Sequence, residues 1–143
     1  MNRPMKTVGI CLALLIGSAC SQDDQITRDT KPYDGIGESE TVTLVGTEPF
    51  WTFVITGESA VYTSPEDLEG TTITLSRFAG NNGISFSGEL NDAPVEIVVT
   101  PGECSDGMSD RNFPFTATIK WGERTLYGCG HTDSQPFSDP EVP

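Results

Sequence analysis

Apolar and polar side chains alternate along most of the chain between residues 41 and 131. In the segment FPFTATIKW (residues 113–121), the aromatic and aliphatic residues fall on one face, and Thr116, Thr118 and Lys120 fall on the other. Strict alternation is typical of a β-strand with one buried face. The pattern predicts eight short strands, near residues 42–46, 50–56, 59–63, 71–78, 84–90, 93–100, 113–121 and 124–129.

Two-residue turns separate several of these strands. Such turns occur at Gly57-Glu58, Asn91-Asp92 and Gly122-Glu123, and each has the composition of a tight hairpin. Closing the turn at 91–92 places Phe86 opposite Ile97, on the faces that the alternation of each strand separately predicts to be buried. The agreement indicates antiparallel pairing.

The strand pattern predicts an all-β fold. No segment has a convincing helical period, and eight strands in about 90 residues indicate a small antiparallel barrel, with a β-sandwich as the alternative. Side chains just fill a barrel of eight strands. We therefore expect little room for a deep ligand cavity inside it.

The first 19 residues have the features of a secretory signal peptide. Arg3 and Lys6 precede an uncharged apolar segment, Val8–Gly17, that is too short for a membrane span of about 20 residues. The following Ser18-Ala19-Cys20 resembles the end of a bacterial lipobox. The resemblance implies lipidation of Cys20, with palmitate among its acyl chains, and anchoring in the outer membrane facing the periplasm. The alternative is a plain signal peptide cleaved just before this cysteine.

Polar segments flank the predicted barrel domain, which spans residues 41–131. Residues 20–40 are acidic and have no apolar period, so we expect a flexible tether behind the lipidated cysteine. Residues 132–143 are rich in proline, and we expect a disordered tail.

The chain is strongly acidic. It has 8 Lys and Arg against 21 Asp and Glu, a net charge of −13, which becomes about −15 if Arg3 and Lys6 leave with the signal peptide. This charge argues against nucleic acid and against direct binding to anionic headgroups, and it suits a cationic envelope protein. The sequence does not predict an oligomeric state.

Under this interpretation, only two of the four cysteines remain available to form a disulfide. Cys11 lies in the signal peptide and Cys20 carries lipid, which leaves Cys104 and Cys129. Two cysteines in an oxidising compartment predict a disulfide.

The segment ECSDGMSDRNFPF (residues 103–115) holds most of the candidate site residues. Its Asp-Gly and serines are typical of a loop, here tied by the predicted disulfide. Asp106, Met108, Asp110 and Arg111 are left as a candidate binding surface. We add Glu48 on the hypothesis that it pairs with Arg111.

Metal binding and catalysis are weaker interpretations. Cys104, Met108, Cys129 and His131 could hold Cu(I), but a disulfide would remove both thiolates. One histidine and the lack of a nucleophile motif disfavour an enzyme. We predict no catalytic residue, no metal site and no cofactor.

Two motifs carry a family resemblance. GTEPFW (residues 46–51), followed by CSDGMSDRNFPF and then LYGC, resembles a family of uncharacterised bacterial envelope proteins and lipoproteins. The resemblance covers residues 45–130 and implies an envelope location without an activity. We expect a non-enzymatic binding or interaction module. The alternatives are an inhibitor of a cationic cell-wall hydrolase such as lysozyme, which the acidic small-barrel architecture resembles, and envelope copper or other soft-metal binding.

Overall fold

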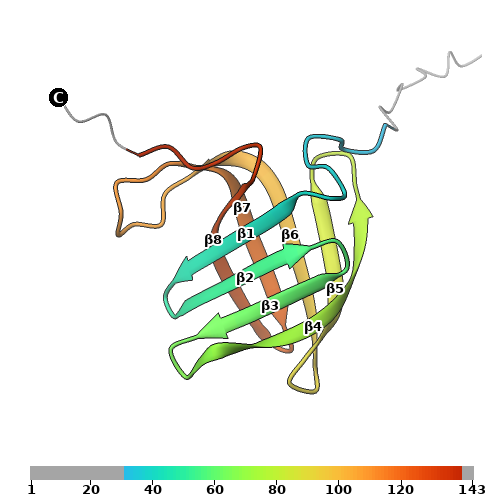
Figure 1. Ribbon diagram of the computed structural model, residues 1–143, viewed down its shortest axis with the longest axis vertical. Helices are drawn as coiled ribbons and strands as arrows, with labels where there is room; N and C mark the ends of the chain where they lie inside the picture. The colour runs from blue at the N-terminus through green and yellow to red at the C-terminus, as the bar shows by residue number, and fades with distance from the viewer. Residues whose placement is uncertain (1–30, 140–143) are drawn as a thin grey trace, which may run out of the picture.

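The structure, a computed structural model, describes residues 31–139 of the chain (Figure 1). It contains eight strands: β1 Thr41–Thr47, β2 Phe50–Thr56, β3 Ser59–Ser64, β4 Asp67–Ala79, β5 Ile84–Leu90, β6 Ala93–Cys104, β7 Phe113–Trp121 and β8 Arg124–Thr132. Neighbouring strands pair antiparallel in chain order, and β8 pairs with β1 to close a barrel. The predicted all-β barrel is confirmed, and the sandwich alternative is wrong.

The predicted hairpin geometry is also present. Phe86 lies opposite Ile97 in the β5–β6 ladder. Asn91 and Asp92 both have positive φ angles, of 53° and 60°, as a type I′ turn requires. Turn chemistry and alternation therefore specify the same register.

Inward side chains fill the barrel with one continuous core. Three aromatic contacts cross it, with ring centroids 5.9 Å apart for Trp51 and Phe53, 4.9 Å for Phe53 and Tyr62, and 5.3 Å for Tyr62 and Trp121. The indole N–H of Trp121 donates to the carbonyl of Leu90 at 2.9 Å. The aromatic residues thus occupy the space that a barrel of this size encloses.

The pairing of β1 with β8 is short. β1 pairs with β2 along its whole length, but its pairing with β8 runs only from Val42 opposite Thr132 to Val45 opposite Cys129. After Val45, the end of β1 lies opposite the part of β8 that precedes Cys129, and these two stretches do not pair. We call this unpaired stretch the open seam.

Trp51 fills the inside of the open seam. A Cβ on Gly46 would lie 2.1 Å from Trp51 Nε1, and a Cβ on Gly128 would lie 2.8 Å from Trp51 Cζ2. Gly46 is therefore needed for the indole to pack against β1. Gly128 is needed first because a Cβ there would overlap the carbonyl oxygen of Val45 in β1, and second because it would crowd the indole.

The N-terminal boundary of the domain differs from the predicted one. Ile36 is only 2% exposed and belongs to the core, and its carbonyl accepts a hydrogen bond from Arg77 Nη2 at 2.8 Å. The backbone N–H of Tyr33 donates to Gly80 at 2.7 Å. Residues 33–40 thus pack on the barrel, because one buried isoleucine anchors a segment that has no apolar period.

The C-terminal boundary differs as well. β8 continues to Thr132, whose N–H donates to Gln135, and Asn112 and Ser138 form a β-bridge. Residues up to Asp139 therefore belong to the folded domain, in contrast to the predicted disordered tail. Phe137 packs on the barrel and anchors this segment. The proline-rich composition of the segment gave no indication of that contact.

The signal peptide and the lipidation of Cys20 lie outside the described residues. Between residues 31 and 139 no helix is long and apolar enough to cross a membrane.

Candidate functional site

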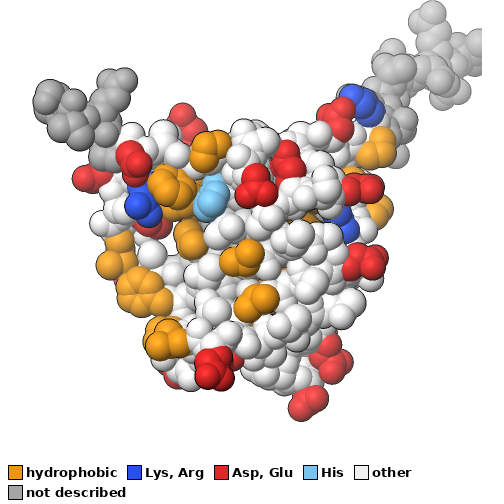
Figure 2. All heavy atoms as spheres, in the orientation of Figure 1, with side chains coloured by type: hydrophobic (Ala, Val, Ile, Leu, Met, Phe, Trp, Pro, Cys, Tyr) orange, Lys and Arg blue, Asp and Glu red, His pale blue; other side chains and the backbone are white. Residues whose placement is uncertain are grey.

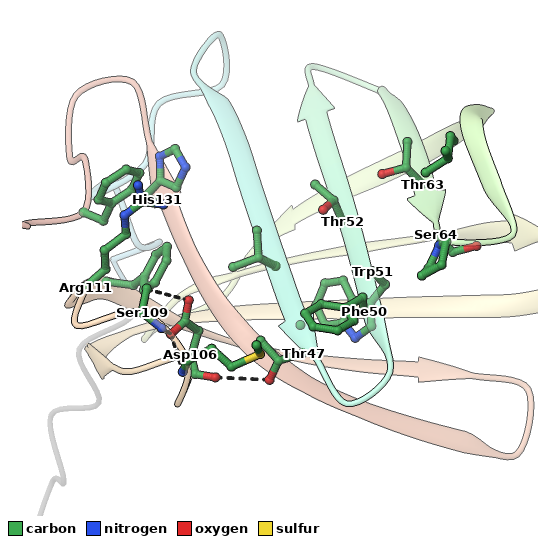
Figure 3. A pocket seen from close by; sticks show the side chains of 17 residues that line it. Thr47, Phe50, Trp51, Thr52, Thr63, Ser64, Asp106, Ser109, Arg111 and His131 are labelled. Carbon is green, nitrogen blue, oxygen red and sulfur yellow. Dashed lines mark hydrogen bonds between the residues drawn. The ribbon is translucent and has the colours of Figure 1, made fainter.

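The two sequence motifs meet on the outer surface of the barrel. The predicted disulfide between Cys104 and Cys129 is present, with Cα atoms 5.5 Å apart, and it ties the loop that follows β6 to β8. Thr47 Oγ1 donates to the carbonyl of Asp106 at 3.1 Å (Figure 3). The loop of residues 105–112, here the Asp106 loop, is thereby fixed beside the turn between β1 and β2.

Asp106 organises its own loop. Its Oδ1 accepts the N–H groups of Met108 at 3.0 Å and Ser109 at 2.8 Å, and its Oδ2 accepts the Ser109 hydroxyl at 2.7 Å. These bonds, first the one from Met108, lower the pKa of the carboxyl below its ordinary 3.8, and the charge of Arg111 contributes least. The carboxylate therefore stabilises the loop that presents Met108.

An open groove of about 660 Å³ lies between the Asp106 loop and the strands β1–β3. Three exposed apolar side chains line it: Phe50, Leu68 and Met108, which are 52%, 82% and 69% exposed. Hydroxyl groups also line it, from Thr47, Thr52, Thr63 and Ser64 (Figure 3). Figure 2 shows apolar side chains gathered along this side of the molecule, with acidic side chains around them. We call this cavity the apolar groove.

Trp51 also lines the apolar groove. It is 3% exposed, and its Nε1 atom is buried without a hydrogen-bond partner among residues 31–139. A buried N–H without an acceptor is costly, and native proteins rarely retain one without a reason. Trp51 thus places a polar group that lacks a partner where the groove meets the open seam.

One wall of the groove is an aromatic cluster. Arg111 stacks on Phe137, with 4.3 Å from its Cζ to the ring centroid. The Phe137 ring also packs against Phe113 and His131, at centroid distances of 5.4 Å and 5.2 Å. The cluster fixes the C-terminal segment against the Asp106 loop.

The predicted Glu48–Arg111 pair is wrong. Arg111 Nε instead lies 3.2 Å from Asp139 Oδ1, and within residues 31–139 Glu48 has no ion-pair partner. The prediction failed because it took the C-terminal segment to be disordered, whereas that segment returns to supply the carboxylate.

A second cavity, of about 350 Å³, opens at the seam. Thr47 and Glu48 line one side, and the segment Thr125–Tyr127 of β8 lines the other. Its remaining lining residues come from the Asp106 loop. We call this cavity the seam slot; it shares Thr47, Asp106 and Met108 with the apolar groove.

The structure brings together most of the predicted binding residues. Asp106, Met108 and Arg111 line the apolar groove, and Glu48 lines the seam slot. Asp110 is exposed and lines neither.

Sequence reasoning missed Phe50 and Leu68. For Phe50 a signal existed, because the alternation that turns Trp51 inward turns Phe50 outward. Leu68 stands in the polar segment SPEDLEG, which gives no such signal.

The disulfide removes two of the four ligands that the sequence suggests for copper. Cys104 and Cys129 are joined to each other, so neither offers the thiolate that Cu(I) prefers. Met108 and His131 remain from the proposed ligand set, and the His131 ring packs in the aromatic cluster. In the described part of the chain no three His, Cys, Asp or Glu residues are grouped to hold a metal ion.

Comparison of the chain with known protein families, with known proteins and with solved structures finds no match. The family resemblance of the two motifs stays a prediction.

Proposed function

We propose that the protein is a non-enzymatic binding module, anchored to the bacterial outer membrane through lipid on Cys20 and facing the periplasm. Its ligand is an exposed segment of a polypeptide that carries both cationic and apolar side chains. The observation that carries the proposal is the apolar groove, in which Phe50, Leu68 and Met108 are exposed together on an acidic protein.

We infer the apolar side chains of the ligand from the exposure of Phe50, Leu68 and Met108 around the groove. Single exposed apolar residues are common, but a contiguous group around a groove is typical of an interaction site. A groove of about 660 Å³ falls within the range of ligand-binding cavities. Met108, which is flexible and polarisable, can adapt to side chains of different shape.

We infer the cationic side chains of the ligand from the negative charge of the protein. The chain has a net charge of −13, and exposed Glu66 and Glu69 flank Leu68 in sequence. Arg111, the cation that lines the groove, is already paired with Asp139. A positively charged partner therefore gains attraction at long range, which accelerates association and weakens as salt is added.

The disulfide supports an exported protein. Disulfides persist in oxidising compartments such as the periplasm and are rare in the cytosol. Together with the lipobox-like Ser18-Ala19-Cys20, this favours the envelope location. Replacement of Cys20 by Ala should abolish palmitate labelling and release the protein from the membrane fraction, and retention of both properties would contradict the anchor.

Calorimetric titration of the disulfide-bonded protein tests the binding site. The probes are lysozyme, which is a cationic cell-wall hydrolase, and a pool of octapeptides that alternate Lys or Arg with Val, Leu or Thr. Met108→Ser and Leu68→Ser should each weaken binding about tenfold, the cost of about 1.4 kcal/mol for one buried apolar contact.

Phe78→Ser is the matched control, because Phe78 is as exposed as Met108, at 69%, and lines a separate cavity over β4–β6. Binding that responds to Phe78→Ser and not to Met108→Ser would place the site elsewhere. Failure of every probe to bind would contradict the proposed function.

A further inference from the structure

The main-chain groups of β8 at the open seam have a defined direction. In an antiparallel ladder, residues alternate between pairs that exchange two hydrogen bonds and pairs whose N–H and C=O groups point to the opposite edges. The two-residue turn Gly122-Glu123 closes on Trp121 and Arg124, which makes that pair hydrogen-bonded. The next β8 residue, Thr125, therefore points its N–H and C=O away from β7, and so does Tyr127.

The pairing of β1 agrees with this assignment. Continued along β8, the alternation directs the N–H and C=O groups of Cys129 and His131 away from β7, and these residues lie opposite Val45 and Thr43 of β1. The ladder to β1 ends at Cys129. Thr125 and Tyr127 thus present two N–H and two C=O groups to an edge that has no partner strand among residues 31–139.

The seam slot lies directly beside this edge. It is lined by Thr125–Tyr127 on one side and by Thr47 and Glu48 on the other, with the Asp106 loop between them. Tyr127 is 73% exposed, so its side chain can cover a chain lying along the edge. A further strand needs a separation of only about 4.8 Å from its neighbour.

We infer that the polypeptide partner binds as an extended strand that adds to the edge of β8 at Thr125–Tyr127 and continues past Met108 into the apolar groove. The inference rests on the proposed function, which it deepens by naming the bound conformation. Strand addition takes affinity from main-chain hydrogen bonds and specificity from the pockets that receive alternate side chains.

The chemistry of the slot and of the groove fits this occupant. Alternation in an extended chain sends successive side chains to opposite sides, so cationic residues can face Glu48 while apolar residues reach Met108 and the groove. The two cavities adjoin at Thr47, Asp106 and Met108, which line both, so a strand longer than the edge itself would leave the slot beside Met108.

Two matched comparisons test the inference with the octapeptide pool described above. The first compares that pool with one of the same side chains whose backbone amides are all N-methylated. The second compares Thr125→Pro with Thr125→Val. Proline removes the N–H that faces the seam and leaves the β7–β8 bonds intact, as is tolerated on an edge strand, whereas valine keeps it.

We expect N-methylation and Thr125→Pro each to weaken binding by tenfold or more, while Thr125→Val binds like the wild type. We also expect the amide protons of Thr125 and Tyr127 to exchange rapidly in the unbound protein and to become protected on binding, whereas those of Leu126 and Gly128 are protected in both states.

Three results would overturn the inference. If N-methylation and Thr125→Pro each change the affinity by less than twofold, while Met108→Ser still weakens binding, the groove is retained as the site and strand addition is rejected. Protected Thr125 and Tyr127 amides in a concentration-dependent dimer would assign the edge to a second copy of the chain. Absence of binding by every peptide would reject the inference, and absence of binding by lysozyme as well would reject the proposed function.

Discussion

Thr47 Oγ1 donates a hydrogen bond of 3.1 Å to the carbonyl oxygen of Asp106. This bond joins the turn between β1 and β2 to the Asp106 loop, although the two residues lie 59 positions apart in the chain. It holds Met108 beside Thr47, and both residues line the apolar groove and the seam slot. The geometry of the proposed site therefore depends on the attachment of one loop to the barrel.

Removal of the disulfide should loosen this attachment. Cys104 and Cys129 are separated by 25 residues, and in the chain-entropy model a closed loop of this length contributes about 3 kcal/mol of stability. We expect the Cys104→Ser/Cys129→Ser variant to lose an amount of that order in urea unfolding. Titration of free thiols in the oxidised wild-type domain should find none from these two cysteines, and reactive thiols there would contradict the pairing.

Glycine is required at the open seam. A Cβ on Gly46 would lie 2.1 Å from Trp51 Nε1, so Gly46→Ala should destabilise the protein by about 1–3 kcal/mol, the usual cost of overpacking a core. Gly102→Ala is the control, because the nearest atom to its Cβ is 3.7 Å away, and we expect a change within about 0.5 kcal/mol. Equal free energies of unfolding for the two variants would show that Trp51 does not pack as described.

The Asp106 loop should lose stability in acid. The pKa of Asp106 in the folded protein is lowered from 3.8, chiefly by the N–H of Met108 and by the hydroxyl and N–H of Ser109. Its contribution is therefore fully present above pH 3.8 and is lost as the pH falls below that value through the lowered pKa. We expect amide chemical shifts of Met108 and Ser109 to follow this titration.

Ser109→Ala removes one of the bonds that favour the ionised carboxylate. We therefore expect it to move the midpoint of that titration to higher pH. An unchanged midpoint would mean that the Ser109 hydroxyl does not stabilise the charge.

The C-terminal segment should depend on Phe137. Its ring contacts Arg111, Phe113 and His131, and such aromatic and cation–π contacts contribute about 0.5–1.5 kcal/mol each. We expect Phe137→Ala to increase amide exchange at Ser138 and at Asn112, its bridge partner. Unchanged exchange at both would show that the bridge holds the segment without the ring.

Local patterns predicted most of the fold. Alternation and two-residue turns determine strand pairing over short distances, so the eight strands and the register of Phe86 and Ile97 followed from the sequence. The disulfide followed from the cysteine count and the expected compartment.

The candidate site was only partly predictable, because its contacts join distant segments. Ile36 and Phe137 each anchor an otherwise polar segment, and one apolar residue produces no period. The partner of Arg111 was missed for the same reason, since Asp139 lies in one of these segments. The open seam follows from where the β1–β8 ladder ends, which no local pattern indicates.

A titration of the ¹⁵N-labelled, disulfide-bonded protein with the alternating cationic and apolar peptide pool tests the central claim most directly. We predict salt-sensitive chemical-shift changes that map to Thr47, Phe50, Leu68 and Met108 and leave Phe78 and Val98 unaffected. Changes confined to Phe78 and Val98, or no changes at low ionic strength, would contradict the assignment of the apolar groove as the binding site.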